Sequence, residues 1–131
     1  MTNILEQYGP MSIRCATILL VDDEEAIRSI LRDYLNDLQY NVIEASNGDE
    51  AIAVIDSMVK IDLVITDIIM PGATDGLSLI DYARRANPRT RTIAMSGFAG
   101  SYNASVKKAD KFMSKPFTFP ALEREVNLLI N

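Results

Sequence analysis

Two kinds of apolar pattern alternate along this chain. Short, nearly continuous apolar runs occur five times, over residues 16–21, 41–45, 63–65, 92–95 and 111–113. The first and third runs lack the apolar–polar alternation of a strand that has one face in solvent. We therefore expect five β-strands, of which the central ones are buried on both faces, as in a parallel sheet.

Between these runs the apolar residues recur at helical spacing. The stripes are Ile27, Ile30, Leu31, Tyr34, Leu35 and Leu38; Ala51, Ile52, Ile55, Met58 and Val59; Leu77, Ile80 and Ala83; and Leu122, Val126, Leu129 and Ile130. Thr118 is a plausible N-cap for the last helix, with Pro120 in its first turn. Between Phe98 and Ala109 the apolar pattern is thin, so a helix there is expected to be short or irregular.

Alternation of strands and helices predicts an α/β fold with a parallel sheet. Right-handed connections leave few topologies for five strands. We expect a flavodoxin-like doubly wound sheet with strand order 2-1-3-4-5 and helices on both faces. Residues 16–131 would form one domain, preceded by an N-terminal extension over residues 1–15.

Composition removes several classes of function. The 131 residues include no histidine, which excludes Ser-His-Asp and Cys-His catalysis and a role as phosphohistidine carrier. Lys and Arg number 13 against 18 Asp and Glu, a net charge of −5, which offers no electrostatic footprint for nucleic acid or an anionic membrane. Cys15 is the single cysteine, and no run approaches the ~20 apolar residues of a membrane span. We expect a cytoplasmic protein.

Polar residues follow four of the five predicted strands. Asp22 and Asp23 come after the first strand, Asp67 after the third, Ser96 after the fourth and Lys115 after the fifth. In the order 2-1-3-4-5 these four strands are neighbours, and function in such sheets lies at their carboxyl ends. Three carboxylates, a hydroxyl and an ammonium group should therefore share one crevice.

Clustered carboxylates repel one another, and a hard divalent cation removes the conflict. Mg²⁺ binds oxygen ligands and keeps several waters, whereas the absence of sulfur and imidazole argues against zinc. Beside Mg²⁺, the Asp67 carboxylate can attack phosphorus and form an aspartyl phosphate. Lys115 and the Ser96 hydroxyl could each bind a phosphoryl oxygen.

Each of these residues also has an ordinary structural explanation. Asp22 and Asp23 could simply cap the following helix, and Asp67 could be a solvated strand end. Ser96 could be a turn residue, and Lys115 could be a surface lysine. Their joint occurrence at the ends of four different strands favours a shared site.

Five segments together resemble the receiver domain of bacterial response regulators. They are residues 18–24 (ILLVDDE), 62–71 (DLVITDIIMP), 75–76 (DG), 95–97 (MSG) and 115–117 (KPF). The resemblance extends over about residues 16–130. It implies a two-component signalling module that takes phosphate from a histidine kinase or phosphotransfer protein.

The resemblance also implies individual roles. Asp67 would be the phosphoacceptor, and Ser96 and Lys115 would contact the phosphate. Phe112 matches the aromatic switch residue. The Lys115–Pro116 peptide would be cis.

For Mg²⁺, the resemblance implies direct binding by Asp23, Asp67 and the backbone carbonyl of Ile69, with Asp22 acting mainly through water. The module would dephosphorylate itself slowly without being a turnover enzyme. Phosphorylation would reshape a face that binds a downstream protein, in a monomer or weak dimer.

Three departures from the family pattern stand out. The loop from Met70 to Gly76 is one residue longer than usual, the interval from Ser96 to Lys115 is a few residues shorter, and Lys108 replaces a frequent glycine. The last two predict a remodelled output face at the fourth helix.

Three other functions compete. The first is a phosphate-independent interaction module of the same fold. The second, a Mg²⁺-dependent phosphatase, would need a second acidic residue where Ile69 stands. The third, a flavin carrier, is opposed by Asp22, Asp23 and Glu24, which would repel the flavin phosphate.

Overall fold

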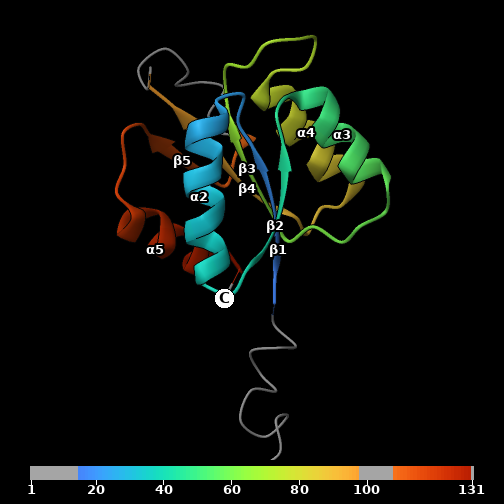
Figure 1. The fold of residues 1–131 in the computed structure, drawn as a ribbon. Helices are drawn as coiled ribbons and strands as arrows, with labels where there is room; N and C mark the ends of the chain where they lie inside the picture. Colours follow the sequence, from blue (N-terminus) through green and yellow to red (C-terminus); the bar gives the residue numbers. More distant parts are fainter. Residues whose placement is uncertain (1–14, 98–107, 131) are drawn as a thin grey trace, which may run out of the picture.

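The five predicted strands form one parallel sheet. The computed structural model describes residues 15–97 and 108–130. The strands are β1 (Thr17–Val21), β2 (Asn41–Ala45), β3 (Leu63–Asp67), β4 (Arg91–Ser96) and β5 (Lys111–Ser114). Their order is β2-β1-β3-β4-β5, all neighbours parallel, as predicted (Figure 1).

Helices cover both faces of the sheet. They are α2 (Glu25–Asp37), α3 (Gly48–Asp56), α4 (Gly76–Ala86) and α5 (Phe119–Ile130). Helices α2 and α5 lie on one face, and α3 and α4 lie together on the other (Figure 1). Thr118 caps α5 as predicted, since its Oγ1 accepts a hydrogen bond from the Ala121 amide at 3.2 Å.

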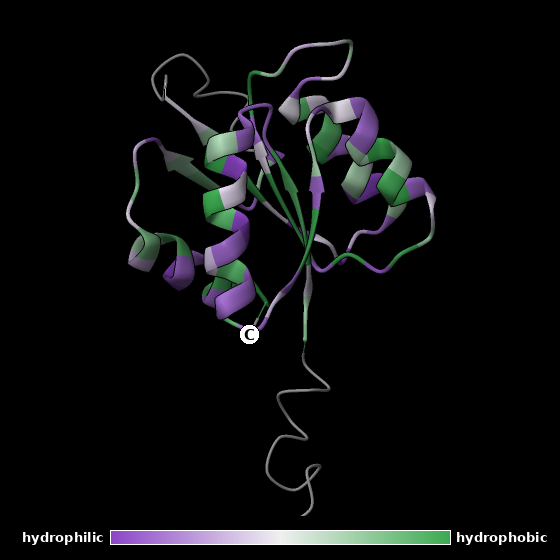
Figure 2. Cartoon of the chain, viewed as in Figure 1, coloured by the Kyte–Doolittle hydropathy of each residue, from purple (hydrophilic) through white to green (hydrophobic). Residues whose placement is uncertain are grey.

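The sheet divides the core into two layers. In β1, Ile18 and Leu20 pack towards α2 and α5, whereas Leu19 and Val21 pack towards α3 and α4. Successive side chains of a strand point to opposite faces, so a strand covered on both sides must be apolar throughout. Figure 2 shows the result as a hydrophobic sheet interior between helices with mixed outer surfaces.

Three residues of the predicted helical stripes lie outside the core: Ile30, Met58 and Val59. Helix α3 ends at Asp56, and Met58 is 90% exposed with a left-handed φ of 70°. The chain turns there to enter β3, so apolar spacing overestimates the helix length. Ile30 is 55% exposed because it lies at the edge of the α2 stripe, while the neighbouring Leu31 is buried.

The predicted short helix between Phe98 and Ala109 falls almost entirely on residues 98–107, which lie outside the described residues, as does most of the N-terminal extension. Among the helices that the structure describes, none combines the length and the apolar character needed to cross a membrane.

The layered core predicts a large difference between two leucines of α5. Leu122 is fully buried, whereas Leu128 is 73% exposed. We expect Leu122→Ala to lower the free energy of unfolding by about 2–5 kcal/mol, because it removes buried methyl groups and leaves a cavity. The matched variant Leu128→Ala should change it by less than about 0.5 kcal/mol. Urea unfolding measures both, and equal losses would contradict this packing.

Candidate functional site

The carboxyl ends of the strands bring the predicted polar residues to one edge of the sheet. Asp22 directly follows β1, Asp67 ends β3, and Ser96 ends β4. Lys115 directly follows β5, and its amide donates to the Ser96 carbonyl at 2.8 Å. The parallel register pairs these strands residue by residue, so their ends coincide.

Three carboxylates form an acidic cluster. Asp22, Asp23 and Asp67 each offer an oxygen, and these oxygens lie within 4.8 Å of one another. Asp22 is fully buried and Asp67 is 7% exposed, whereas Asp23 faces solvent. A set made only of oxygen donors, open on one side to water, fits Mg²⁺, which prefers oxygen and retains several waters.

Lys115 supplies the opposite charge. Its Nζ lies 2.6 Å from Oδ1 of Asp67 and 3.4 Å from Oδ2 of Asp22. One ammonium group thus pairs with two buried carboxylates, which leaves an excess of negative charge. A bound divalent cation would compensate that excess.

Burial and the neighbouring charges shift the pKa values of Asp67 and Lys115. Burial raises the pKa of Asp67 to about 7, the neighbouring Asp22 also raises it, and the ion pair with Lys115 opposes the rise. Burial acts to lower the pKa of Lys115, but Asp67 and Asp22 outweigh it and raise that pKa overall. Lys115 therefore stays charged, while Asp67 gains or loses its proton near pH 7 in the metal-free protein.

A close backbone approach positions Asp67. The Ile68 amide donates to the Met95 carbonyl at 2.9 Å, and the Gly76 amide donates to the Ile68 carbonyl at 2.9 Å. A Cβ on Gly76 would lie 1.8 Å from the Asp67 carbonyl oxygen, so only glycine fits at the start of α4. In the sequence, Gly76 stands out only as part of the Asp-Gly pair.

Phe112 belongs to an apolar cluster that includes the residue after Asp67. Its half-buried side chain packs against the cluster of Ile68, Ile80 and Ala94. Ile68, a member of this cluster, directly follows Asp67 in the chain. Ile69, the proposed carbonyl ligand, is 55% exposed in the following loop. The Lys115–Pro116 peptide is cis, as the resemblance implied.

Comparison with known proteins identifies the family. The family model of the response regulator receiver domain matches residues 18–127. The chain belongs to this family. Receiver domains are the phosphoacceptor modules of two-component systems and are not turnover enzymes, although some relatives join them to enzymatic domains. They bind Mg²⁺ at an acidic cluster and interact with histidine kinases and phosphotransfer proteins.

Some similar proteins have about the same length as this chain, whereas others are much longer. The response regulator protein TrrA from Thermotoga maritima, solved with Mg(2+)-BeF, is 34% identical with a TM-score of 0.80, over 87% of this chain and 98% of that chain. A response regulator receiver protein from Sinorhizobium medicae is 31% identical with a TM-score of 0.83, over 91% and 97%. The autoinducer 1 sensor kinase/phosphatase LuxN from Vibrio campbellii is 32% identical over 88% of this chain, which spans only 14% of that kinase.

The close approach at Gly76 predicts a sharp cost for one added methyl group. We expect Gly76→Ala to lower the free energy of unfolding by about 1–3 kcal/mol, because the new Cβ must displace the Asp67 backbone. Gly97→Ala is the matched control, since nothing lies within 4 Å of a Cβ built there and its φ is not left-handed. Urea unfolding of both variants tests this, and equal stability of the two would contradict it.

The raised pKa of Asp67 predicts a pH dependence of the metal-free protein. The ordinary pKa of this carboxyl is 3.8, and the folded value is about 7. Between these values the folded state binds the extra proton, so the free energy of unfolding falls as pH rises. Asp67→Asn removes this loss, and its stability relative to wild type should increase from pH 4 to about pH 7. Urea unfolding in chelator measures the difference, and a difference independent of pH would refute the assignment.

Proposed function

We propose that this chain accepts a phosphoryl group on Asp67 from a histidine kinase or phosphotransfer protein. The observation that carries the proposal is the Asp67 carboxylate itself. It is almost buried at the end of β3, paired with Lys115 at 2.6 Å and clustered with two further carboxylates. Membership of the receiver family adds support.

Asp22, Asp23, Asp67 and the backbone carbonyl of Ile69 would hold Mg²⁺. When bound, the ion neutralises charge on the phosphoryl oxygens. The protein contributes the position of the donors: Asp22 is held in the interior, whereas Asp23 remains open to water. The phosphoryl group would therefore approach from the solvent side, where Asp23 is exposed.

The transfer forms one bond and breaks another. A carboxylate oxygen of Asp67 attacks phosphorus, and the bond from phosphorus to the donor nitrogen breaks, with its electron pair leaving on the donor imidazole. Lys115, no longer paired with the carboxylate that has attacked phosphorus, is placed to hold a phosphoryl oxygen. Water later attacks the phosphorus, which releases inorganic phosphate and restores the Asp67 carboxylate.

Ser96 and Phe112 would convert the new charge into a change of shape. The Ser96 hydroxyl, at the end of β4, would donate to a phosphoryl oxygen, and the Phe112 ring would move into the space this leaves. Phe112 already packs against the cluster that contains Ile68, next to the acceptor. The altered surface would be recognised by a downstream protein target.

We assign this function to residues 16–131, with residues 1–15 as an extension outside the domain. A cytoplasmic location follows from a kinase or phosphotransfer protein as the donor, and the free thiol of Cys15 is compatible with a reducing compartment.

Intact-protein mass after incubation with acetyl phosphate tests the proposal. With Mg²⁺ we expect a single phosphoryl adduct, and none with EDTA, because the clustered carboxylates need a cation to admit phosphate. Asp67→Asn should give no adduct, whereas the control Asp37→Asn, an exposed residue at the end of α2, should behave as wild type.

Beryllofluoride, which mimics a bound phosphoryl group, covers the case of a short-lived adduct. Binding of beryllofluoride with Mg²⁺ would support the proposal even where the adduct hydrolyses before detection. If wild type shows neither an adduct nor beryllofluoride binding, the chain is a phosphate-independent interaction module.

A further inference from the structure

Every polar group of Asp22 has a partner outside the acidic cluster. The Asp22 amide donates to the Ala45 carbonyl at 3.2 Å, and its Oδ1 accepts from the Glu24 amide at 2.9 Å. Its Oδ2 lies 3.4 Å from Lys115 Nζ. The backbone carbonyl of Asp22 accepts a hydrogen bond from Nη1 of Arg28 at 2.7 Å.

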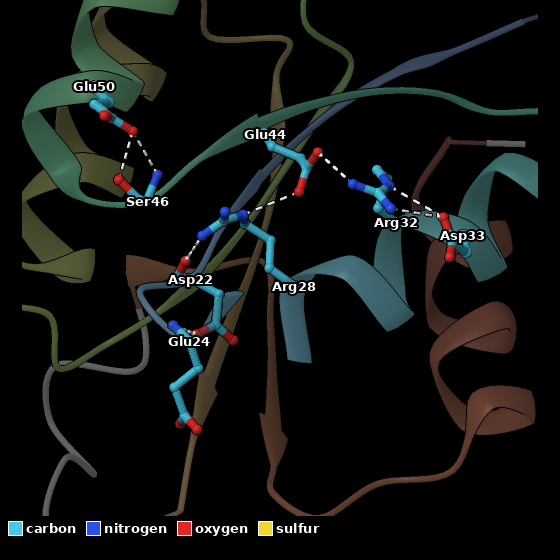
Figure 3. A network of polar contacts seen from close by, with 8 residues as sticks. All are labelled: Asp22, Glu24, Arg28, Arg32, Asp33, Glu44, Ser46 and Glu50. Atoms are coloured by element: carbon cyan, nitrogen blue, oxygen red, sulfur yellow. Dashed lines mark hydrogen bonds and ion pairs between the residues drawn. The ribbon is translucent and has the colours of Figure 1, made fainter. Parts of the chain in front are cut away.

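A carboxylate on the neighbouring strand orients Arg28. Nε of Arg28 pairs with Oε1 of Glu44 at 3.0 Å, and the Arg28 side chain is only 14% exposed. Oε2 of Glu44 pairs with Nη1 of Arg32, also at 3.0 Å, one helical turn further along α2. Figure 3 shows Glu44 between the two guanidinium groups, with Arg28 extending on to Asp22.

The sheet register explains this meeting of α2, β2 and the loop after β1. Glu44 pairs with Leu20 in the register of β1 and β2, and Ala45 pairs with Val21. The end of β2 therefore contacts the loop in two ways. The Ala45 carbonyl accepts a hydrogen bond from the Asp22 amide. Glu44 binds the Arg28 guanidinium, which in turn donates to the Asp22 carbonyl.

We propose that Arg28, oriented by Glu44, is a positioning residue for the acidic cluster. Arg28 holds the Asp22 carbonyl while Glu24 and Lys115 hold the Asp22 carboxylate, and so the loop presents the carboxylates of Asp22 and Asp23 in one orientation. The inference rests on the proposed function, because it assigns to Arg28 a share of the Mg²⁺ affinity of that site. Groups that orient metal ligands typically contribute roughly 10- to 100-fold in metal affinity.

The electrostatic role and the positioning role of Arg28 predict opposite changes in Mg²⁺ affinity when Arg28 is removed. Arg28 is a cation beside a site for a cation, so loss of its charge alone should strengthen Mg²⁺ binding. Loss of the carbonyl contact should instead weaken it, because the loop no longer holds the carboxylates together. The sign of the change therefore separates a positioning role from a purely electrostatic one.

Isothermal titration of the full chain with Mg²⁺ is the test. We expect Arg28→Gln to weaken binding by roughly 10-fold or more. Arg28→Lys keeps the charge but lacks the planar fork that serves Glu44 and Asp22 together, and it should also weaken binding. Arg32→Gln is the matched control, because it removes the same charge and contacts the same Glu44 without touching the loop. It should bind Mg²⁺ at least as tightly as wild type.

Two further readouts separate positioning from general destabilisation. In metal-free protein, hydrogen exchange of the Glu24 amide should accelerate in the Arg28 variants and not in Arg32→Gln, because that amide reports the Asp22 orientation. With acetyl phosphate, the Arg28 variants should need more Mg²⁺ for half-maximal phosphorylation yet approach the wild-type rate at saturation. If Arg28→Gln does not fold, Arg28→Lys carries the test.

The outcomes distinguish the inference from the function on which it rests. A wild-type chain that binds no Mg²⁺ overturns both. A wild-type chain that binds Mg²⁺, with Arg28 variants that bind as tightly or more tightly, overturns only the role of Arg28. Equal weakening in the Arg28 variants and in Arg32→Gln also overturns it.

Discussion

The ion pair between Lys115 and Asp67 is the interaction on which this site depends. It joins the ends of β5 and β3 across 2.6 Å, and the fully buried Asp22 lies within 3.4 Å of the same ammonium group. One positive charge cannot balance the acidic cluster. In the proposed function, Mg²⁺ would balance the excess negative charge and Lys115 would hold a phosphoryl oxygen.

The rest of the fold holds these charges in place. Strand order β2-β1-β3-β4-β5 brings the ends of β1, β3 and β5 to one edge, although β4 lies between β3 and β5. Gly76 lets the start of α4 approach the Asp67 backbone, and Arg28 links Asp22 to β2. These contacts use backbone groups, so they position the acids without competing for the carboxylate oxygens that the chemistry requires.

Much of this could be predicted from the sequence, because buried parallel strands are apolar throughout and their ends are marked by polar residues. The strands and the topology were predictable for that reason. The roles of Phe112 and Ile69 came only from family resemblance and stay predictions. Neither Gly76 nor the Arg28–Glu44 pair was visible as a positioning element. Both depend on sheet register and on backbone approach between segments distant in sequence, which local patterns do not encode. Met58 was wrongly assigned to a helix. Its spacing continues the apolar stripe of α3, but α3 ends at Asp56 and the backbone turns at Met58.

The most direct test is to locate the phosphoryl group itself. Treatment of acetyl phosphate-labelled protein with borohydride reduces an acyl phosphate to the corresponding alcohol, and tandem mass spectrometry then identifies the modified residue. We predict homoserine at position 67 and unchanged aspartate at positions 22 and 23, because Asp67 has the shorter ion pair to Lys115, 2.6 Å against 3.4 Å for Asp22. Homoserine at position 22 or 23, with Asp67 unmodified, would contradict it.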